Sequence, residues 1–301
     1  MSPSGTKPKK KDSKPKGKGK GKDSKPKKKD SKPKVKRAAK RKAKNRYTAE
    51  GADRHELYEL SVQSPEADVE FIVRAYREIR KKLPRFLRED FCGTALLCSE
   101  WVKQGPNYFA HGYDLDPDPV EWGKKRNLEP LGDAADRVTV FLEDCRTPSD
   151  DLPDIRVAQN FSYSLFKTRA ELLDYFKKAH ETLADDGIFV MDMYGGPEAT
   201  DEMEEEREID EGFTYIWDQH EFFPGTGEFK CKIHFKFEDG TELRNAFEYD
   251  WRCWYMPEVK DLLLEAGFSK VGSYFEGDGD FQPNERGDNC AAWIAYLVAE
   301  K

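Results

Sequence analysis

Apolar positions along the chain follow two alternating spacings. Residues 65–83 place apolar side chains at helical intervals behind Ser64-Pro65, a pair typical of a helix start. Short apolar runs that favour strands then alternate with further helical segments. The strands are predicted at 85–90, 108–114, 137–142, 155–161 and 188–193, and the helices that separate them at 95–103, 119–127 and 169–183. Such alternation is typical of a mostly parallel sheet with helices on both faces.

The spacing changes after residue 200. Three segments either alternate apolar and polar residues or are rich in aromatic residues. Turn residues at 224–227 and 238–240 separate these segments, as in β-hairpins. The segments are 213–222, 228–237 and 241–250, so we expect an antiparallel β insertion over about residues 205–250. A helix at 257–266, closed by Gly267, and strands at 270–276 and 291–299 complete the pattern. The prediction is an α/β fold with a doubly wound, seven-stranded, mostly parallel sheet.

Charge divides the chain into two parts. The first 46 residues hold 22 of its 51 basic residues and 3 of its 58 acidic residues, a net charge of +19. The remaining 29 basic and 55 acidic residues give segment 47–301 a net charge of −26. The hexamer KDSKPK occurs three times in the first segment, which lacks aromatic residues, so we expect a disordered Lys-rich tail at 1–46 and one domain at 47–301. Residues 7–46 suit weak polyanion or nucleic-acid contact, or serve as a solubilising tail.

Other features narrow the class of protein. No apolar run approaches the ~20 residues that span a bilayer, and the N-terminus has no apolar signal core, so we expect no membrane segment. The six cysteines form no CxxC pair, which indicates reduced thiols and a cytoplasmic location. The five histidines show no metal-ligand spacing. We therefore predict no metal site.

The most informative motif lies at residues 86–95, where an apolar strand ends in Asp90 and a tight turn opens a helix. Gly93 lets the backbone approach a ligand because it has no Cβ. The turn has one glycine rather than the GxGxxG that holds a pyrophosphate. Twenty-four residues later the next strand ends at Asp114, where a carboxylate can accept hydrogen bonds from ribose hydroxyls. Both turns follow strand ends, where open α/β sheets bind ligands. This combination suits a nucleoside ligand without phosphates.

These motifs resemble class I S-adenosylmethionine-dependent methyltransferases, in the variant whose glycine loop reads Asp-x-Cys-Gly-Thr. The resemblance implies a Rossmann-like fold, S-adenosyl-L-methionine as cofactor and transfer of its methyl group to an acceptor. It also implies cofactor-binding roles: the methionine end at Asp90, Cys92, Gly93 and Thr94, the ribose at Asp114, the adenine at Leu115, Asp144 and Cys145, and the methyl group near Asn160. The sequence departs from the family at Ala95, where glycine is common.

Methyl transfer from a sulfonium mainly requires alignment and exclusion of water, and a general base is optional. The catalytic candidates are Asn160 and Tyr163, in the loop after the fourth strand. An acceptor is expected beyond the fourth and fifth strands, beneath the insertion. The candidate substrate residues there are Asp192, Tyr194, Trp251, Arg252 and Trp254. Aromatic walls with a few polar groups suit a small organic acceptor.

Each candidate also has an ordinary structural interpretation. Asp90 and Asp114 suit turn or capping roles, and Asp144 suits an exposed surface position. Trp251 and Trp254 suit positions in the core. The main functional alternative is a nucleic-acid or protein methyltransferase that uses the basic tail for non-specific binding. A cofactor-binding protein without catalysis remains open, and a dinucleotide dehydrogenase is disfavoured because the phosphate-binding glycines are missing.

Overall fold

The computed structural model describes residues 47–277 and 279–301. These residues lie in the second of the two units into which the chain divides, Ala43–Lys301. The Lys-rich segment 1–46 lies outside the described residues, so its predicted disorder and polyanion contact stay predictions. None of the described helices has the length and apolar character needed to cross a membrane.

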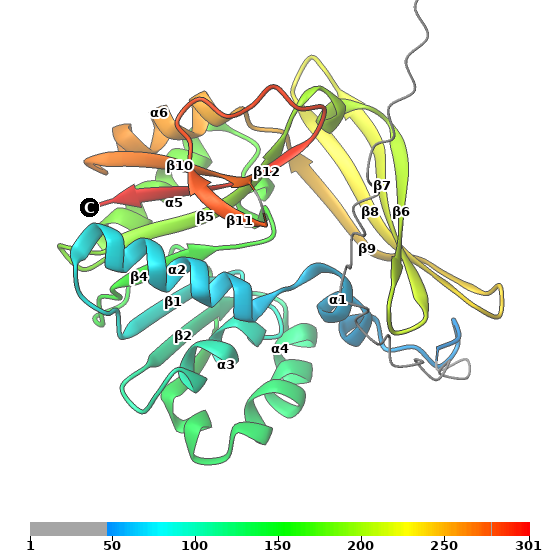
Figure 1. The fold of residues 1–301 in the computed structure, drawn as a ribbon, viewed down its shortest axis with the longest axis horizontal. Helices are drawn as coiled ribbons and strands as arrows, with labels where there is room; N and C mark the ends of the chain where they lie inside the picture. Colours follow the sequence, from blue (N-terminus) through cyan, green and yellow to red (C-terminus); the bar gives the residue numbers. More distant parts are fainter. Residues whose placement is uncertain (1–46, 278) are drawn as a thin grey trace, which may run out of the picture. The chain divides into compact units, whose positions relative to one another are not determined.

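The larger sheet in the described residues has eight strands in the order β11-β10-β12-β5-β4-β1-β2-β3 (Figure 1). Strands β1 to β5 pair in parallel, and β12 and β10 add to β5 as antiparallel strands. The bounds are β1 Phe86–Asp90, β2 Phe109–Asp114, β3 Val138–Leu142, β4 Ile155–Ala158, β5 Ile188–Gly195, β10 Lys270–Gly277, β11 Asp280–Pro283 and β12 Trp293–Glu300. The predicted doubly wound, mostly parallel sheet is confirmed. The short edge strand β11 is one strand more than the seven predicted, because its four residues show no apolar alternation.

Helices cover both faces of this sheet. On one face, α2 (Pro65–Arg80) and α3 (Leu96–Lys103) bury Ile72 and Trp101 in a core with β1. On the other face, α5 (Arg169–Glu181) and α6 (Met256–Ala266) bury Phe176 and Leu263 against β5. The remaining helical segments are α1 Arg54–Val62, α4 Pro117–Gly123, η1 Lys124–Leu128, η2 Glu129–Arg137, η3 Ser162–Leu165 and η4 Pro197–Thr200. Both faces are covered, so the binding surface left open is at the strand ends.

The second sheet is antiparallel and has the order β6-β7-β8-β9. Its strands are β6 Met203–Ile209, β7 Phe213–Phe223, β8 Glu228–Phe237 and β9 Glu242–Arg252. The predicted antiparallel insertion is confirmed, and it contains one further strand, β6. The apolar pattern did not indicate β6 because most of its residues are glutamates. One face of this sheet packs on α1 through Leu57, Phe213 and Phe235. The sequence pattern did not predict α1, a helix of nine residues whose Leu57 side chain is buried in this contact.

Candidate functional site

A cavity of about 410 Å³ opens beside the carboxyl ends of β1, β2 and β4. Its lining comes from both sheets and from α1, so residues far apart in the sequence meet there. The strand-end turns contribute Phe91, Cys92, Gly93, Thr94, Asp114, Asp116, Pro119, Asn160 and Ser162, and the opposite wall contributes Arg54, His55, Tyr58, Gln63, Asn245, Ala246, Phe247, Glu248 and Tyr249. Five of the predicted cofactor residues therefore share one cavity: Cys92, Gly93, Thr94, Asp114 and Asn160.

The glycine turn after β1 has an unusual backbone. Phe91, Gly93 and Ala95 have φ values of 58°, 51° and 54°, so every second residue is left-handed. A Cβ built on Gly93 would meet no atom within 4 Å, which leaves the ligand side of the turn open. Ala95 takes the left-handed position where the resembling family often has glycine, and this conformation costs an L-residue about 1–2 kcal/mol.

Another glycine, which sequence reasoning missed, supports this turn from behind. A Cβ on Gly123, at the end of α4, would overlap the Thr94 carbonyl oxygen. The missing side chain at Gly123 therefore lets α4 pack directly on the glycine turn. The sequence signal is a glycine inside an otherwise regular helical segment, which commonly marks a close approach of two backbones.

Asp114 joins the two strand-end turns. Its Oδ2 accepts a hydrogen bond from the Gly93 N–H at 2.8 Å, and its Oδ1 accepts one from the Asp116 N–H at 2.9 Å. Burial raises the pKa of this carboxyl group. A carboxylate oxygen has more than one acceptor site, so both oxygens keep capacity for hydroxyl donors.

Asn160 lies in a strained turn that Asp192 holds. Asn160 and Phe161 have φ values of 57° and 58°, and their backbone N–H groups donate to the two Asp192 carboxylate oxygens at 2.8 and 2.9 Å. Burial raises the pKa of Asp192 to about 7. Asp192, predicted as a substrate residue, does not line the cavity and instead fixes the turn that presents Asn160 to it.

Asp90 does not line the cavity, so its contact with a cofactor stays a prediction. Its side chain is buried and faces α5, away from the cavity, where it accepts from Arg88 Nε at 3.0 Å, Arg156 Nε at 2.6 Å and the Tyr175 hydroxyl at 2.7 Å. The carbonyl oxygen of Cys145 accepts from both arginines. Asp90 is therefore the shared counter-charge of two buried arginines. The missed signal is an arginine inside each of two apolar strands, because a buried arginine requires a counter-charge.

Glu89, which the sequence did not single out, faces α3 on the other side of β1. Its Oε2 accepts from the Cys98 N–H at 3.2 Å and from the Cys98 thiol at 3.0 Å. Burial raises the pKa of Glu89 to about 8. Glu89 thus fixes the start of α3, the helix that the glycine turn opens.

The three residues predicted near an adenine do not line the cavity. Asp144 forms a two-pronged ion pair with Arg146, at 2.9 and 2.7 Å, and this pairing lowers its pKa to about 2. Cys145 is buried, and Leu115 is exposed. Contact of these residues with an adenine ring stays a prediction.

The remaining candidates lie outside the cavity lining and pack against neighbouring residues, so their contact with a substrate stays a prediction. Tyr163 and Trp254 are buried in the core beneath α5 and α6, and the Trp254 indole N–H donates to the Phe166 carbonyl at 3.1 Å. Trp251 and Tyr194 belong to an aromatic cluster under β8. Arg252 stacks on Trp254, with its guanidinium carbon 3.7 Å from the ring centre. Adjacent elements cover these aromatic side chains, as the core interpretation expected.

Helix α1 supplies part of the cavity wall that sequence reasoning missed. Glu59 accepts from the Thr94 hydroxyl at 2.6 Å and from the Asn127 amide at 2.7 Å, which ties α1 to the glycine turn. His55 is buried, with Nε2 3.0 Å from an Asp118 oxygen. One available signal was Asp53, which caps α1 through the His55 and Glu56 N–H groups.

Comparisons with known proteins place the fold. No family model and no curated protein sequence matches the chain. Among solved structures, an S-adenosylmethionine-dependent methyltransferase from Clostridium acetobutylicum is similar, with a TM-score of 0.62 and 15% identity over 81% of this chain and 96% of that one. The CcbJ methyltransferase from Streptomyces caelestis has a TM-score of 0.62 and 16% identity, over 79% of this chain and 97% of that one. A third similar structure is CalS10, an amino pentose methyltransferase from Micromonospora echinaspora solved with S-adenosylmethionine bound. Its TM-score is 0.60 and its identity 17%, over 86% of this chain and 99% of that one.

These likenesses extend over nearly the whole length of each solved chain, so they include the antiparallel insertion as well as the large sheet. At such low identity they establish a shared fold. The chain has the fold of S-adenosylmethionine-dependent methyltransferases, and the Rossmann-like prediction is confirmed.

Proposed function

We propose that this protein is an S-adenosylmethionine-dependent methyltransferase that acts on a small-molecule acceptor. The observation that carries the proposal is the cavity itself, which lies at the strand ends of a methyltransferase fold. Asp114 and the glycine turn form one wall, and α1 with β9 covers the other. The amino pentose named for CalS10 supports a small acceptor that carries an amine.

The residues of the strand-end wall fit the cofactor. The open side of Gly93 gives room for a ligand against the backbone, and Asp114 offers carboxylate oxygens for ribose hydroxyls. The cavity volume of about 410 Å³ lies within the range typical of small-molecule sites. S-adenosylmethionine would supply an electrophilic methyl group on a sulfonium sulfur. Residues 92–94, Asp114 and Asn160 would orient it.

The opposite wall suits an acceptor of limited size. Tyr58, Phe247 and Tyr249 present aromatic surface, and Arg54, Gln63 and Asn245 add polar groups. An amine lone pair forms the new bond to the methyl carbon as the bond from carbon to sulfur breaks, and the amine proton leaves to water. The walls contribute by aligning the acceptor and excluding competing water.

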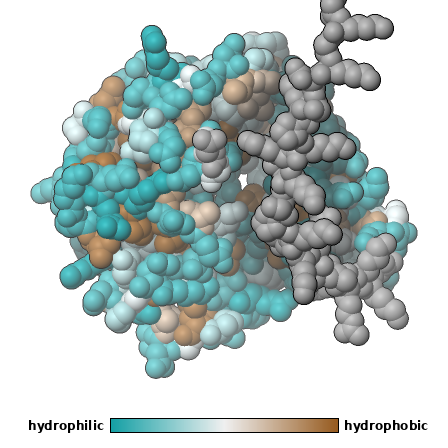
Figure 2. All heavy atoms as spheres, viewed as in Figure 1, coloured by the Kyte–Doolittle hydropathy of each residue, from teal (hydrophilic) through white to brown (hydrophobic). Residues whose placement is uncertain are grey.

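Charge disfavours the nucleic-acid alternative for this site. Residues 47–301 carry a net charge of −26, which repels a phosphate backbone. The face of the molecule in Figure 2 is mainly hydrophilic, and its apolar residues form separated patches rather than one broad docking surface.

Calorimetry with S-adenosylmethionine and S-adenosylhomocysteine tests the cofactor. We expect micromolar binding to the wild type, weakened by at least about 1–2 kcal/mol in Asp114→Ala because a buried acceptor for ribose hydroxyls is lost. Asp185→Ala, an exposed turn variant with the same charge change, should bind like the wild type. Failure of the folded wild type to bind either compound would refute the proposal.

A transfer assay tests the acceptor class. Labelled S-adenosylmethionine is incubated with amino sugars, with RNA and with protein extract, using the full chain and a chain lacking residues 1–46. We expect label only on a small amine, at equal rates for both chains. Label on RNA that requires the tail would instead support the nucleic-acid alternative.

A further inference from the structure

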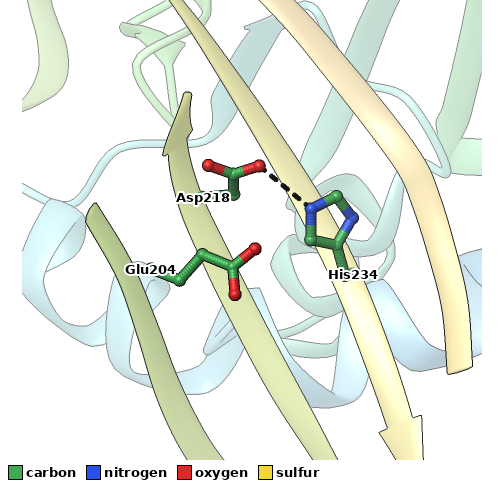
Figure 3. A group of neighbouring side chains, drawn as sticks. All are labelled: Glu204, Asp218 and His234. Carbon is green, nitrogen blue, oxygen red and sulfur yellow. Dashed lines mark hydrogen bonds and ion pairs between the residues drawn. The ribbon is translucent and has the colours of Figure 1, made fainter. Parts of the chain in front are cut away.

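Three polar side chains gather on the antiparallel sheet away from the glycine turn: Glu204 on β6, Asp218 on β7 and His234 on β8 (Figure 3). Their nearest ligand-type atoms all lie within 4.8 Å of one another. Asp218 and His234 are buried, and His234 is fully enclosed at 0% exposure. None of the three lines the cavity, either on the strand-end wall proposed for the cofactor (the cofactor wall) or on the opposite wall from α1 and β9 proposed for the acceptor (the acceptor wall).

The hydrogen bonds of His234 distinguish this group from a metal centre. Its Nδ1 accepts the Asn245 backbone N–H at 2.8 Å, so the neutral ring carries its proton on Nε2. That Nε2–H points at Asp218 Oδ2, 3.1 Å away, as the dashed line in Figure 3 shows. A metal at Nε2 would need the lone pair that the proton occupies. Glu204 already accepts a hydrogen bond from Arg244 at 2.7 Å. Asp218, His234 and the Asn245 N–H therefore form a chain of hydrogen bonds, and Glu204 lies beside it.

The chain of hydrogen bonds from Asp218 through His234 ends at an irregularity in the antiparallel sheet. Ile233 pairs with Phe247 and Phe235 with Leu243, so three residues of β9 stand opposite the single residue His234. Asn245, at the centre of these three, has a φ of 51°. A bulge removes ladder partners from its extra residues. The His234 ring replaces the missing partner for the Asn245 N–H.

The bulge lies within the part of β9 that lines the cavity. Asn245 and Ala246 line it from the bulge, and Phe247, Glu248 and Tyr249 continue this lining along the regular strand. The Ala246 carbonyl also accepts a hydrogen bond from Arg54 Nη1 at 3.4 Å, which joins the bulge to α1 across the opening. A regular β9 would lack the extra residues that carry these contacts.

We propose that His234, held by Asp218, is a positioning residue that sets the acceptor wall at Asn245–Phe247. His234 touches neither the cofactor wall nor the acceptor, and it acts through the Asn245 backbone. The role in acceptor binding rests on the proposed function, whereas the role in fixing the bulge does not.

A matched pair of variants tests the bulge. Leu and Asn have similar size, but only Asn offers an oxygen near the position of Nδ1. We expect amide hydrogen exchange in a peptide covering 243–249 to rise about tenfold or more in His234→Leu, because a backbone donor loses its acceptor, and to recover toward wild type in His234→Asn. Exchange in β5 should stay unchanged in both.

His220→Leu serves as the control. His220 Nδ1 also lies near Asp218, at 3.5 Å, but makes no bond to Asn245, so exchange at 243–249 should match wild type. Unchanged exchange in His234→Leu would overturn the proposal. An equal rise in both His234 variants, without recovery by Asn, would also overturn it. Protection of 243–249 on addition of zinc ions alone would overturn the hydrogen-bonded interpretation in favour of a metal site.

Steady-state kinetics with the amine acceptor from the transfer assay test the role of His234 in acceptor binding. His234→Leu should raise KM for the acceptor at least fivefold, with kcat and S-adenosylhomocysteine affinity within twofold of wild type. If S-adenosylhomocysteine affinity fell by the same factor as the acceptor KM rose, the acceptor role would be overturned. Failure of the wild type itself to bind S-adenosylhomocysteine would count against the proposed function and leave the exchange result on the bulge intact.

Discussion

The two walls of the cavity differ in how far apart their residues lie in the chain. The cofactor wall comes mainly from turns that directly follow β1, β2 and β4, and a few residues of local sequence shape each turn. The acceptor wall joins α1 to β9, and its hydrogen bond from Arg54 to Ala246 spans 192 positions. The comparison teaches that the wall proposed for the cofactor takes its backbone shape mainly from local turns, which distant residues such as Asp192 then hold, whereas the wall proposed for the acceptor exists only because distant segments pack together.

The largest expected effect tests whether Asp90 supports the cofactor wall from below or touches the ligand. Asp90→Asn should destabilise the protein by about 3–5 kcal/mol in urea unfolding, because Arg88 and Arg156 would stay buried without a counter-charge. Asp185→Asn, exposed in the turn before β5, should unfold like the wild type. A loss below about 1 kcal/mol, combined with tenfold weaker S-adenosylhomocysteine binding, would restore the sequence-based role of Asp90.

A smaller effect tests whether the two walls are independent. Gly123→Ala should cost about 1–3 kcal/mol, as overpacking does, and weaken S-adenosylhomocysteine binding because the new Cβ displaces the Thr94 carbonyl. Hydrogen exchange at 243–249 should not change. Gly277→Ala, where a Cβ meets no atom within 4 Å, is the matched control. Increased exchange at 243–249 in Gly123→Ala would show that the walls are coupled.

The last prediction concerns a pH dependence of the support behind the glycine turn, which is measured as a slope with pH rather than as a single loss of stability. Glu89 has a usual pKa of 4.5 when unfolded and about 8 when folded, so its protonated form is the one favoured by folding. The stability from Glu89 is fully present below about pH 4.5 and is lost as pH rises through 8. The stability of the wild type relative to Glu89→Gln should therefore fall with rising pH, by up to about 1.4 kcal/mol per pH unit.

Urea midpoints of the two proteins from pH 5 to 9 measure this difference. Asp192 titrates in both and cancels from the comparison. A constant difference across this range would mean that Glu89 stays ionised in the folded protein.

Local sequence signals located the turns that line the cavity. Gly93 and Asp114 were singled out because a short apolar strand followed by a small-residue turn specifies backbone geometry within a few residues, and both residues line the cavity. The same reasoning could not tell which way Asp90 faces, since a carboxylate at a strand end looks alike whether it faces a ligand or two arginines. The side-chain types of Trp251 and Trp254 likewise suit both a binding wall and a core.

The sequence by itself determined the alternation of strands and helices, the antiparallel insertion and the glycine turn, because hydrophobic spacing and backbone sterics act over short distances. Only the tertiary structure decided which face of β1 Asp90 occupies, that α1 closes the cavity, and that His234 bonds to Asn245. Those outcomes depend on which distant segment supplies a partner. A side chain's role is settled by its neighbours in space, and spacing along the chain does not encode them.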